Sequence, residues 1–171
     1  MKRLTVLRHA KSSWDDRALD DFNRPLNERG RKAARRIGRE LKHRGMQFDL
    51  VLASTAARVR ETIDGIQQKY DFEAPIEFEQ RIYAATDGTL LELVRTLPDA
   101  VRSPLLVGHN PGLERLIVGL THRDKNGLRD RVAGKFPTGG LVMIELPVEH
   151  WRDVQQAAGE VIEQIFPKDL D

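Results

Sequence analysis

A short apolar run near the start of the chain most constrains the fold. Residues 4–7 are apolar or β-branched, and they lead without a break into Arg8, His9 and Lys11. Such a run predicts a buried first strand over residues 4–8. In open α/β sheets, ligands bind at the carboxyl ends of the strands. A cationic turn at that position favours a phosphate or sulfate-like anion, because arginine and lysine donate hydrogen bonds to its oxygens.

Strand and helix patterns alternate along most of the chain. After the first strand, apolar runs typical of strands recur over residues 49–53, 75–78, 104–108, 141–146 and 161–166. Segments with apolar residues at helical spacing lie between them, the first ending at Gly45 and the third near Leu97. Capping residues mark the expected helix starts: Asn27, Ser54 or Thr55, Thr86 or Asp87, and Asn110 before Pro111.

This alternation predicts an α/β fold, with a mostly parallel central sheet covered by helices on both faces. The three layers form one domain spanning residues 1–171, and the last two strands are free to pair antiparallel at an edge. Residues 122–140 are basic and rich in turn formers. The sequence leaves open whether they form a lid or a loop that contacts a partner.

The composition excludes several classes of protein. There are no cysteines, so disulfides and a thiolate nucleophile are excluded. The apolar run that follows Met1, Lys2 and Arg3 is too short for a signal peptide. No stretch approaches the roughly 20 apolar residues of a membrane span. We therefore expect a cytoplasmic protein that does not associate with membranes.

Positive charge is concentrated between Arg29 and Arg44, where eight lysines and arginines accompany one acid, Glu40. The net charge of the whole chain is only +2. A solvated helix face and a docking surface for an acidic partner protein both explain this segment. Nucleic acid is not expected as a partner, because no recognised binding motif and no interleaved aromatic residues accompany the charge.

Polar side chains follow three of the predicted strands at the point where each strand ends. Arg8 and His9 follow the first strand, Arg58 lies in the opening turn of the helix after residues 49–53, and His109 follows residues 104–108. Parallel strands end at the same edge of a sheet, so we expect these four side chains to share one crevice. Two of the loops lead into helix N-termini, whose dipoles favour an anion. The sequence therefore predicts a phosphate site.

No metal-binding motif accompanies this site. The H-E-x-x-H, EF-hand and P-loop patterns are all missing from the sequence. His43, His122 and His150 lack comparable neighbours, and we interpret them as ordinary structural or surface histidines. The expected chemistry is phosphoryl transfer held by arginines, with no metal and no cofactor.

Three blocks, residues 7–10, 54–62 and 107–112, carry the residues of the predicted site. They resemble the Arg-His-Gly, serine-arginine-threonine and late-histidine signatures of the histidine phosphatase (phosphoglycerate mutase-like) superfamily. The small size of the chain, the Arg24-Pro25-Leu26 segment with Gly30, and residues 137–140 are similar to the SixA-type phosphohistidine phosphatases. The resemblance extends from Leu4 to about Leu146 and implies a phosphoglycerate mutase-like fold.

The resemblance also implies roles for the matching residues. His9 is expected to be the nucleophile that forms a phosphohistidine intermediate. Arg8, Arg58 and His109 are expected to bind the phosphoryl oxygens and stabilise the transition state. Lys11, Arg24 and Glu79 are expected to contact substrate, and Ser54 to cap the second helix.

Two positions depart from the superfamily pattern. Ala10 replaces the glycine of the first signature, a change that backbone with negative φ tolerates. Gln80 stands where members that act on sugar phosphates often carry a catalytic glutamate, with Glu79 one residue away. A glutamine cannot donate a proton as an acid, and general acid catalysis contributes about 10²–10⁴-fold. An imidazole leaving group needs such help less than an alkoxide does, because its pKa is near 6.5.

The sequence therefore favours a phosphatase that removes phosphate from histidine on a protein with an acidic docking surface. Two alternatives stay open. One is a phosphatase for small phosphorylated metabolites, with Glu79 as general acid. The other is a module that binds phosphate without turnover and docks through residues 29–44.

Overall fold

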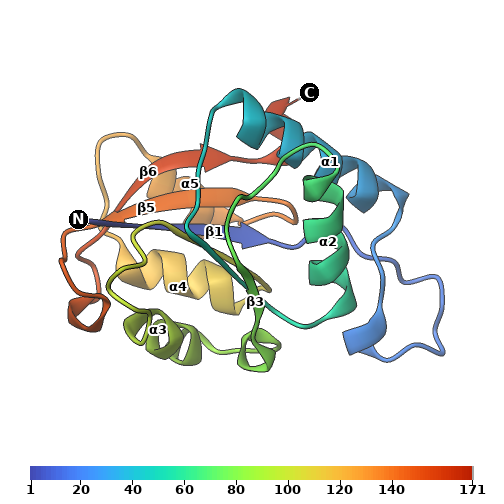
Figure 1. The fold of residues 1–171 in the computed structure, drawn as a ribbon, viewed down its shortest axis with the longest axis horizontal. Helices are drawn as coiled ribbons and strands as arrows, with labels where there is room; N and C mark the ends of the chain where they lie inside the picture. The colour runs from blue at the N-terminus through green and yellow to red at the C-terminus, as the bar shows by residue number, and fades with distance from the viewer. Residues whose placement is uncertain (171) are drawn as a thin grey trace.

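The computed structural model describes residues 1–170 and contains one six-stranded sheet (Figure 1). The strand order is β3-β2-β4-β1-β5-β6. The first four strands in this order pair in parallel, whereas β5 pairs antiparallel with both β1 and β6. The strands are β1 (Lys2–Arg8), β2 (Leu50–Ala53), β3 (Ile76–Phe78), β4 (Pro104–Gly108), β5 (Leu141–Leu146) and β6 (Glu160–Ile165).

Helices cover both faces of this sheet, as the alternating pattern predicts. One face packs against the first two helices, and the other packs against the remaining three (Figure 1). Within β1, Leu7 belongs to the first of these cores and Val6 to the second, because successive side chains of a strand point to opposite faces. The helices are α1 (Glu28–His43), α2 (Ala57–Gln67), α3 (Asp87–Arg95), α4 (Gly112–Leu120) and α5 (Leu128–Gly134).

The α/β fold class and the mostly parallel sheet are thus confirmed, as is the antiparallel edge. The cap at Asn27 is also confirmed, since its Oδ1 accepts a hydrogen bond from the Gly30 N–H at 2.8 Å. Gly45, with a φ of +64°, follows the end of α1 as expected. None of the helices in residues 1–170 is long and apolar enough to cross a membrane.

Two predicted caps are wrong by one or two residues. Ala56, not Ser54 or Thr55, is the N-cap of α2, because the Ser54 hydroxyl is engaged with His109. Pro111, not Asn110, is the N-cap of α4. The Asn110 side chain still accepts a hydrogen bond from the Glu114 N–H, in the first turn of α4, at 3.3 Å. Its Nδ2 donates to the Phe136 carbonyl at 2.9 Å, which links the start of α4 to the segment before β5.

The basic segment 122–140 contains a helix that the sequence pattern does not indicate. This helix, α5, has seven residues, and only one of them, Val132, is buried. A single buried position creates no periodic signal, so the helix depends on its packing against α4 and β6.

The start of α1 is in close contact with the loop that follows β1. A Cβ atom at position 30 would lie 2.0 Å from the Lys11 carbonyl oxygen. Only glycine, which has no Cβ, avoids this clash. That same carbonyl accepts a hydrogen bond from the Asn27 N–H at 3.0 Å. The helix therefore fixes the backbone two residues after His9.

Candidate active site

The carboxyl ends of β1 and β4 bring the two predicted histidines together. Arg8 is in register with Gly108, and the His9 N–H donates to the Gly108 carbonyl at 3.1 Å. The His9 and His109 rings, one residue beyond each strand, lie with their centroids 5.2 Å apart. Both rings are buried, with exposed fractions of 6% and 8%.

One hydrogen bond fixes the tautomer of His9. Its Nδ1 lies 2.7 Å from the Ala10 carbonyl oxygen. A carbonyl only accepts, so Nδ1 carries the proton and Nε2 keeps a lone pair. Burial, with smaller effects from His109, Arg58 and Arg8, lowers the pKa of His9 from 6.5 to about 3. The ring is therefore neutral near pH 7, with Nε2 available as a nucleophile.

His109 is held by Ser54. Its Nε2 lies 2.8 Å from the Ser54 Oγ, which also accepts a hydrogen bond from the Ala56 N–H at 3.2 Å. The Nδ1 of His109, on the other side of the ring, is buried and has no hydrogen-bond partner within residues 1–170. Burial, followed by the charge of Arg58, lowers the pKa of His109 to about 4. Ser54 thus positions a site residue and does not have the capping role expected of it.

Arg58 lies in the first turn of α2 and is buried, with 6% of its surface exposed. Its guanidinium donates from Nη1 to the backbone carbonyl of Asp21 at 2.7 Å, and from Nη2 to the Asp21 carboxylate at 3.0 Å. The Tyr83 hydroxyl donates to the same carboxylate at 2.7 Å. The Tyr83 ring also packs edge-on against His109, with centroids 5.5 Å apart.

Asp21 is a site residue that the sequence reasoning missed. It sits in a single 3₁₀ turn, residues 21–23, and its carboxylate joins Arg58, Tyr83 and Arg24. The hydrogen bond from Tyr83, followed by those from Arg24 and Arg58, holds the pKa of this carboxyl well below its usual range. The sequence did offer one indication of this role. Asp21 lies three residues before Arg24, in a segment already singled out, and a carboxylate at that spacing can pair with the arginine.

Arg24 is buried and belongs to this network. Its Nη2 donates to Asp21 at 3.0 Å and its Nη1 to the Ser12 hydroxyl at 2.7 Å. The guanidinium also stacks 3.5 Å from the ring centre of the exposed Trp14. Its charge contributes to lowering the pKa of His109, so Arg24 acts on the site electrostatically.

Three buried nitrogen atoms around these histidines have no hydrogen-bond partner within residues 1–170. They are Nε of Arg8, Nε of Arg58 and Nδ1 of His109. Leaving a buried donor unpaired costs about 1–3 kcal/mol. An oxyanion beside His9 would supply the missing acceptors. The remaining contacts of Arg8 orient it, since its Nη1 donates to the Phe136 carbonyl at 3.1 Å and Glu114 raises its pKa against the effect of burial.

The structure does not bring Lys11 and Glu79 into this cluster. Lys11 is exposed and lies beside α1, where it lines a neighbouring cleft. The Glu79 carboxylate is paired with Arg81 at 3.0 Å, and the Arg81 hydrogen bonds lower the pKa of Glu79. In the part of the chain that the structure describes, no three His, Asp or Glu side chains gather as a metal site requires.

A three-layer α/β fold with histidines and arginines gathered at the strand ends defines a class of phosphoryl-transfer proteins that work through histidine. Residues 4–101 match the model of the histidine phosphatase superfamily, branch 1. The chain belongs to this superfamily, and so it is a hydrolase of the phosphatase class.

Known relatives and solved structures agree with this assignment. An uncharacterized protein of Mycobacterium tuberculosis is 32% identical over 158 residues, which cover 91% of this chain and 96% of the relative. A structure assigned as the phosphohistidine phosphatase SixA of Agrobacterium tumefaciens is 31% identical, with a TM-score of 0.79 over 97% of this chain and 99% of that one. The corresponding structure from Nakamurella multipartitia is 25% identical, with a TM-score of 0.83 over 97% and 96%.

Proposed function

We propose that this phosphatase hydrolyses phosphohistidine on another protein, through a phosphohistidine intermediate on His9. The likeness to the SixA structure of Agrobacterium tumefaciens supports this substrate class. The observation that carries the proposal is the set of hydrogen bonds that Tyr83, Arg24 and Arg58 donate to the Asp21 carboxylate, because these contacts favour its charged form.

The first step transfers the phosphoryl group to the enzyme. His9 Nε2 attacks phosphorus with its lone pair, and the phosphorus–nitrogen bond of the substrate breaks. The electron pair of that bond stays on the departing nitrogen. Because the substrate ring carries a proton on its other nitrogen, it leaves as a neutral imidazole. The free donors on Arg8, Arg58 and His109 hold the phosphoryl oxygens and stabilise the charge that develops on them.

The second step returns the enzyme to its starting state. Water attacks the phosphorus atom on His9, the bond to Nε2 breaks, and inorganic phosphate is released. The Nδ1 proton stays on its hydrogen bond to the Ala10 carbonyl throughout, so Nε2 recovers its lone pair in the same tautomer.

The state of Asp21 bears directly on the leaving group. Because Tyr83, Arg24 and Arg58 stabilise its negative charge, Asp21 has no proton to donate near neutral pH. Its contacts suit it to orienting the two arginines. A substrate whose leaving group departs without an acid is therefore favoured, and an imidazole meets that condition better than an alkoxide.

A phosphatase for small metabolites is the alternative, and it requires a general acid that can protonate an alkoxide leaving group. Glu79 is the residue that the sequence offers, but it would first have to leave its ion pair with Arg81. Glu114, near Arg8 in the first turn of α4, is a second carboxyl to test.

The deciding experiment compares a histidine-phosphorylated peptide with a panel of phosphomonoesters, without added metal. Wild type, His9→Ala, Glu79→Gln and Glu114→Gln are assayed for phosphate release. We expect kcat/KM for the phosphohistidine peptide to exceed that for the monoesters by about 10²-fold or more. Both carboxyl variants should retain the phosphohistidine activity, and His9→Ala should lose it.

The same assay identifies the alternatives. Faster turnover of a monoester that drops about 10²-fold in Glu79→Gln or Glu114→Gln would assign a metabolite phosphatase. Binding of inorganic phosphate that survives in His9→Ala, with no turnover of any compound by wild type, would assign a binding module.

A further inference from the structure

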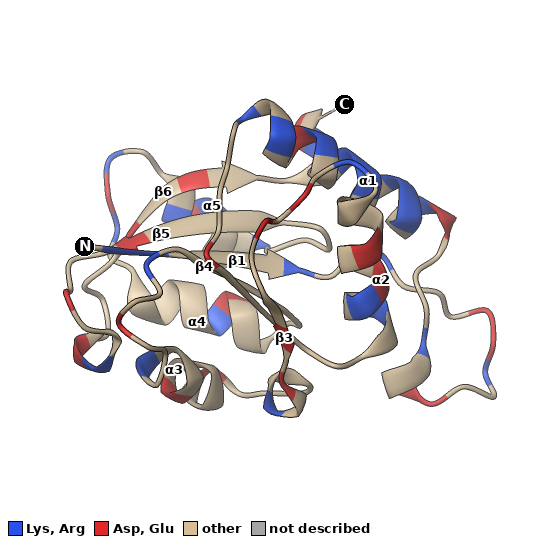
Figure 2. Ribbon diagram, in the orientation of Figure 1, with Lys and Arg blue, Asp and Glu red and all other residues tan. Residues whose placement is uncertain are grey.

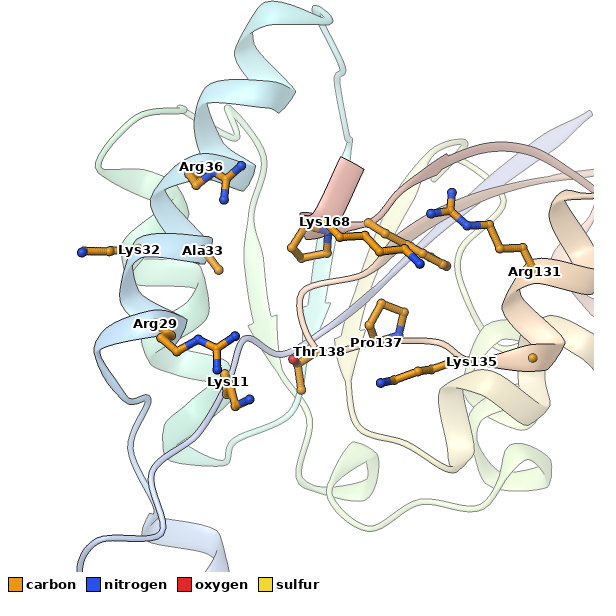
Figure 3. A pocket seen from close by; sticks show the side chains of 13 residues that line it. Lys11, Arg29, Lys32, Ala33, Arg36, Arg131, Lys135, Pro137, Thr138 and Lys168 are labelled. Atoms are coloured by element: carbon orange, nitrogen blue, oxygen red, sulfur yellow. The ribbon is translucent and has the colours of Figure 1, made fainter. Parts of the chain in front are cut away.

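We call Arg8, His9, Arg58 and His109 the catalytic cluster of the proposed function. Beside it lies a cleft of about 760 Å³, between α1 and the segment that follows α5 (Figure 3). Seven of its 13 lining residues are lysine or arginine, and none is acidic. We call it the basic cleft; its cationic residues are Arg36 together with Lys11, Arg29, Lys32, Arg131, Lys135 and Lys168.

The cations come from opposite sides of the cleft. Arg29 and Arg36 point toward it from α1, and Arg131 and Lys135 point toward it from the α5 side (Figure 3). Figure 2 shows that α1 carries the densest run of positive charge on the ribbon. The segment 29–44 is therefore not simply a solvated face, because part of its charge is combined with charge from α5 and from the end of the chain.

Few of these cations form an ion pair that lies within residues 1–170. Arg131 is paired with Asp169 at 2.7 Å. None of the four lysines of the cleft forms an ion pair with any other residue in the range 1–170. Like charges that gather without counter-charges repel one another, and they attract an anionic ligand of matching length.

The basic cleft is physically continuous with the catalytic loop. Pro137 and Thr138 line it, and the next residue, Gly139, donates its N–H to the backbone carbonyls of Arg8 and His9 at 3.0 and 2.9 Å. Lys11 lines it from the other side, two residues after the nucleophile. One end of the cleft is therefore formed by residues that are bonded or adjacent in the chain to Arg8 and His9.

The lining also indicates the kind of ligand. Between the cations the surface is apolar, formed by Ala33, Pro137 and Pro167. A single-stranded nucleic acid would require exposed aromatic rings for base stacking, but Phe166, the aromatic residue among the lining residues, is 2% exposed. Cationic sides with an apolar floor suit a peptide segment that carries both acidic and apolar side chains.

We propose that the basic cleft is a docking site for an acidic, amphipathic segment of the histidine-phosphorylated protein, which it holds beside His9. This inference rests on the proposed function, whose substrate it narrows. It assigns part of segments 29–44 and 122–140 to recognition of the protein and leaves the chemistry to the catalytic cluster.

The test uses two phosphohistidine peptides, one flanked by aspartate and leucine, and the other with asparagine in place of aspartate. Free phosphohistidine serves as the small substrate. For wild type at low salt, we expect kcat/KM for the acidic peptide to exceed that for the neutral one by about tenfold or more. This preference should shrink as salt rises, because exposed charges are screened.

Charge reversal at the cleft provides the matched variants. Lys135→Glu combined with Lys168→Glu should abolish the preference while leaving turnover of free phosphohistidine unchanged. The control combines Arg39→Glu, on α1 but outside the cleft lining, with Lys69→Glu after α2, and it should keep the preference. Equal turnover of both peptides by wild type, or an equal loss in the control, would overturn the docking site.

Failure of the docking site can be separated from failure of the proposed function. If wild type hydrolyses no phosphohistidine compound, the substrate assignment is wrong. Fluorescence anisotropy with the unphosphorylated acidic peptide then tests the cleft alone, with the same variants. Binding that is lost on charge reversal would support the cleft, whereas tighter binding of an oligonucleotide or of inorganic polyphosphate would overturn an acidic segment as its occupant.

Discussion

The catalytic cluster and the basic cleft are neighbouring cationic regions that differ in burial: the side chains of the cluster are mostly buried and hydrogen-bonded, whereas the lysines of the cleft are exposed. In the cluster, Arg58 and the two histidines are more than nine-tenths buried, and hydrogen bonds fix each of them. In the cleft, the lysines extend into solvent without ion pairs in residues 1–170. Burial makes histidine a neutral nucleophile with a defined tautomer. Exposure leaves lysine charged and mobile, which suits attraction over a distance.

The largest expected effect is the loss of turnover on replacing His9, which a change in the basic cleft should not cause. Replacing His9 with alanine removes the only atom assigned to attack phosphorus, so turnover of every substrate should fall by about 10⁴-fold or more. Rapid-quench assays would also show no phosphoenzyme. The cleft variant Lys135→Glu with Lys168→Glu is the contrast, since it should still form phosphoenzyme from free phosphohistidine. Phosphoenzyme in the His9 variant would mean that another residue is the nucleophile.

A smaller effect is expected at Arg58. Arg58→Gln removes a buried donor to the phosphoryl oxygens, and kcat should fall by about 10²–10³-fold. The matched control is Arg39→Gln, which removes an exposed guanidinium from α1. Steady-state kinetics with free phosphohistidine would measure both. Similar losses in the two variants would contradict a special role for the buried arginine.

The burial of the two histidines also has a consequence for stability. Their pKa values in the folded chain, about 3 and about 4, lie below the ordinary 6.5. Between pH 6.5 and pH 4 the unfolded chain therefore binds protons that the folded chain does not. Stability falls as the pH is lowered through this window, by roughly 1.4 kcal/mol per pH unit for each histidine.

Urea unfolding at pH 6.5 and pH 5.5 measures this effect. The free energy of unfolding of wild type should drop by about 2 kcal/mol over that step, because each unfolded histidine is only half protonated at pH 6.5, and His109→Asn should show about half of the drop. His43→Asn, at an exposed position on α1, is the control. An unchanged drop in His109→Asn would show that His109 titrates normally in the folded protein.

The smallest expected effect tests the contact between α1 and the catalytic loop. Gly30→Ala places a methyl group against the Lys11 carbonyl and should destabilise the fold by about 1–3 kcal/mol. Gly134→Ala is the matched control, because nothing lies within 4 Å of a Cβ there. Its stability should change by no more than about 0.5 kcal/mol. Thermal unfolding of both variants measures the difference, and equal midpoints would contradict a tight contact at Gly30.

The sequence alone determined the features that short-range physics controls. The alternation of apolar patterns predicted the layers and the strand ends, and strand ends in a parallel sheet converge. The gathering of Arg8, His9, Arg58 and His109 could therefore be predicted from the sequence. The cap at Asn27 followed from the same local logic, since its partner is three residues away.

Only the tertiary structure decided the contacts between distant segments. Asp21 reaches Arg58 across 37 positions and Tyr83 across 62, and Ser54 reaches His109 across 55. The basic cleft likewise combines α1 with α5 and the end of the chain. Side chains on separate loops and helices leave no shared period in the sequence. Their meeting depends on how the helices pack on the sheet, which is a property of the whole core and not of any single segment.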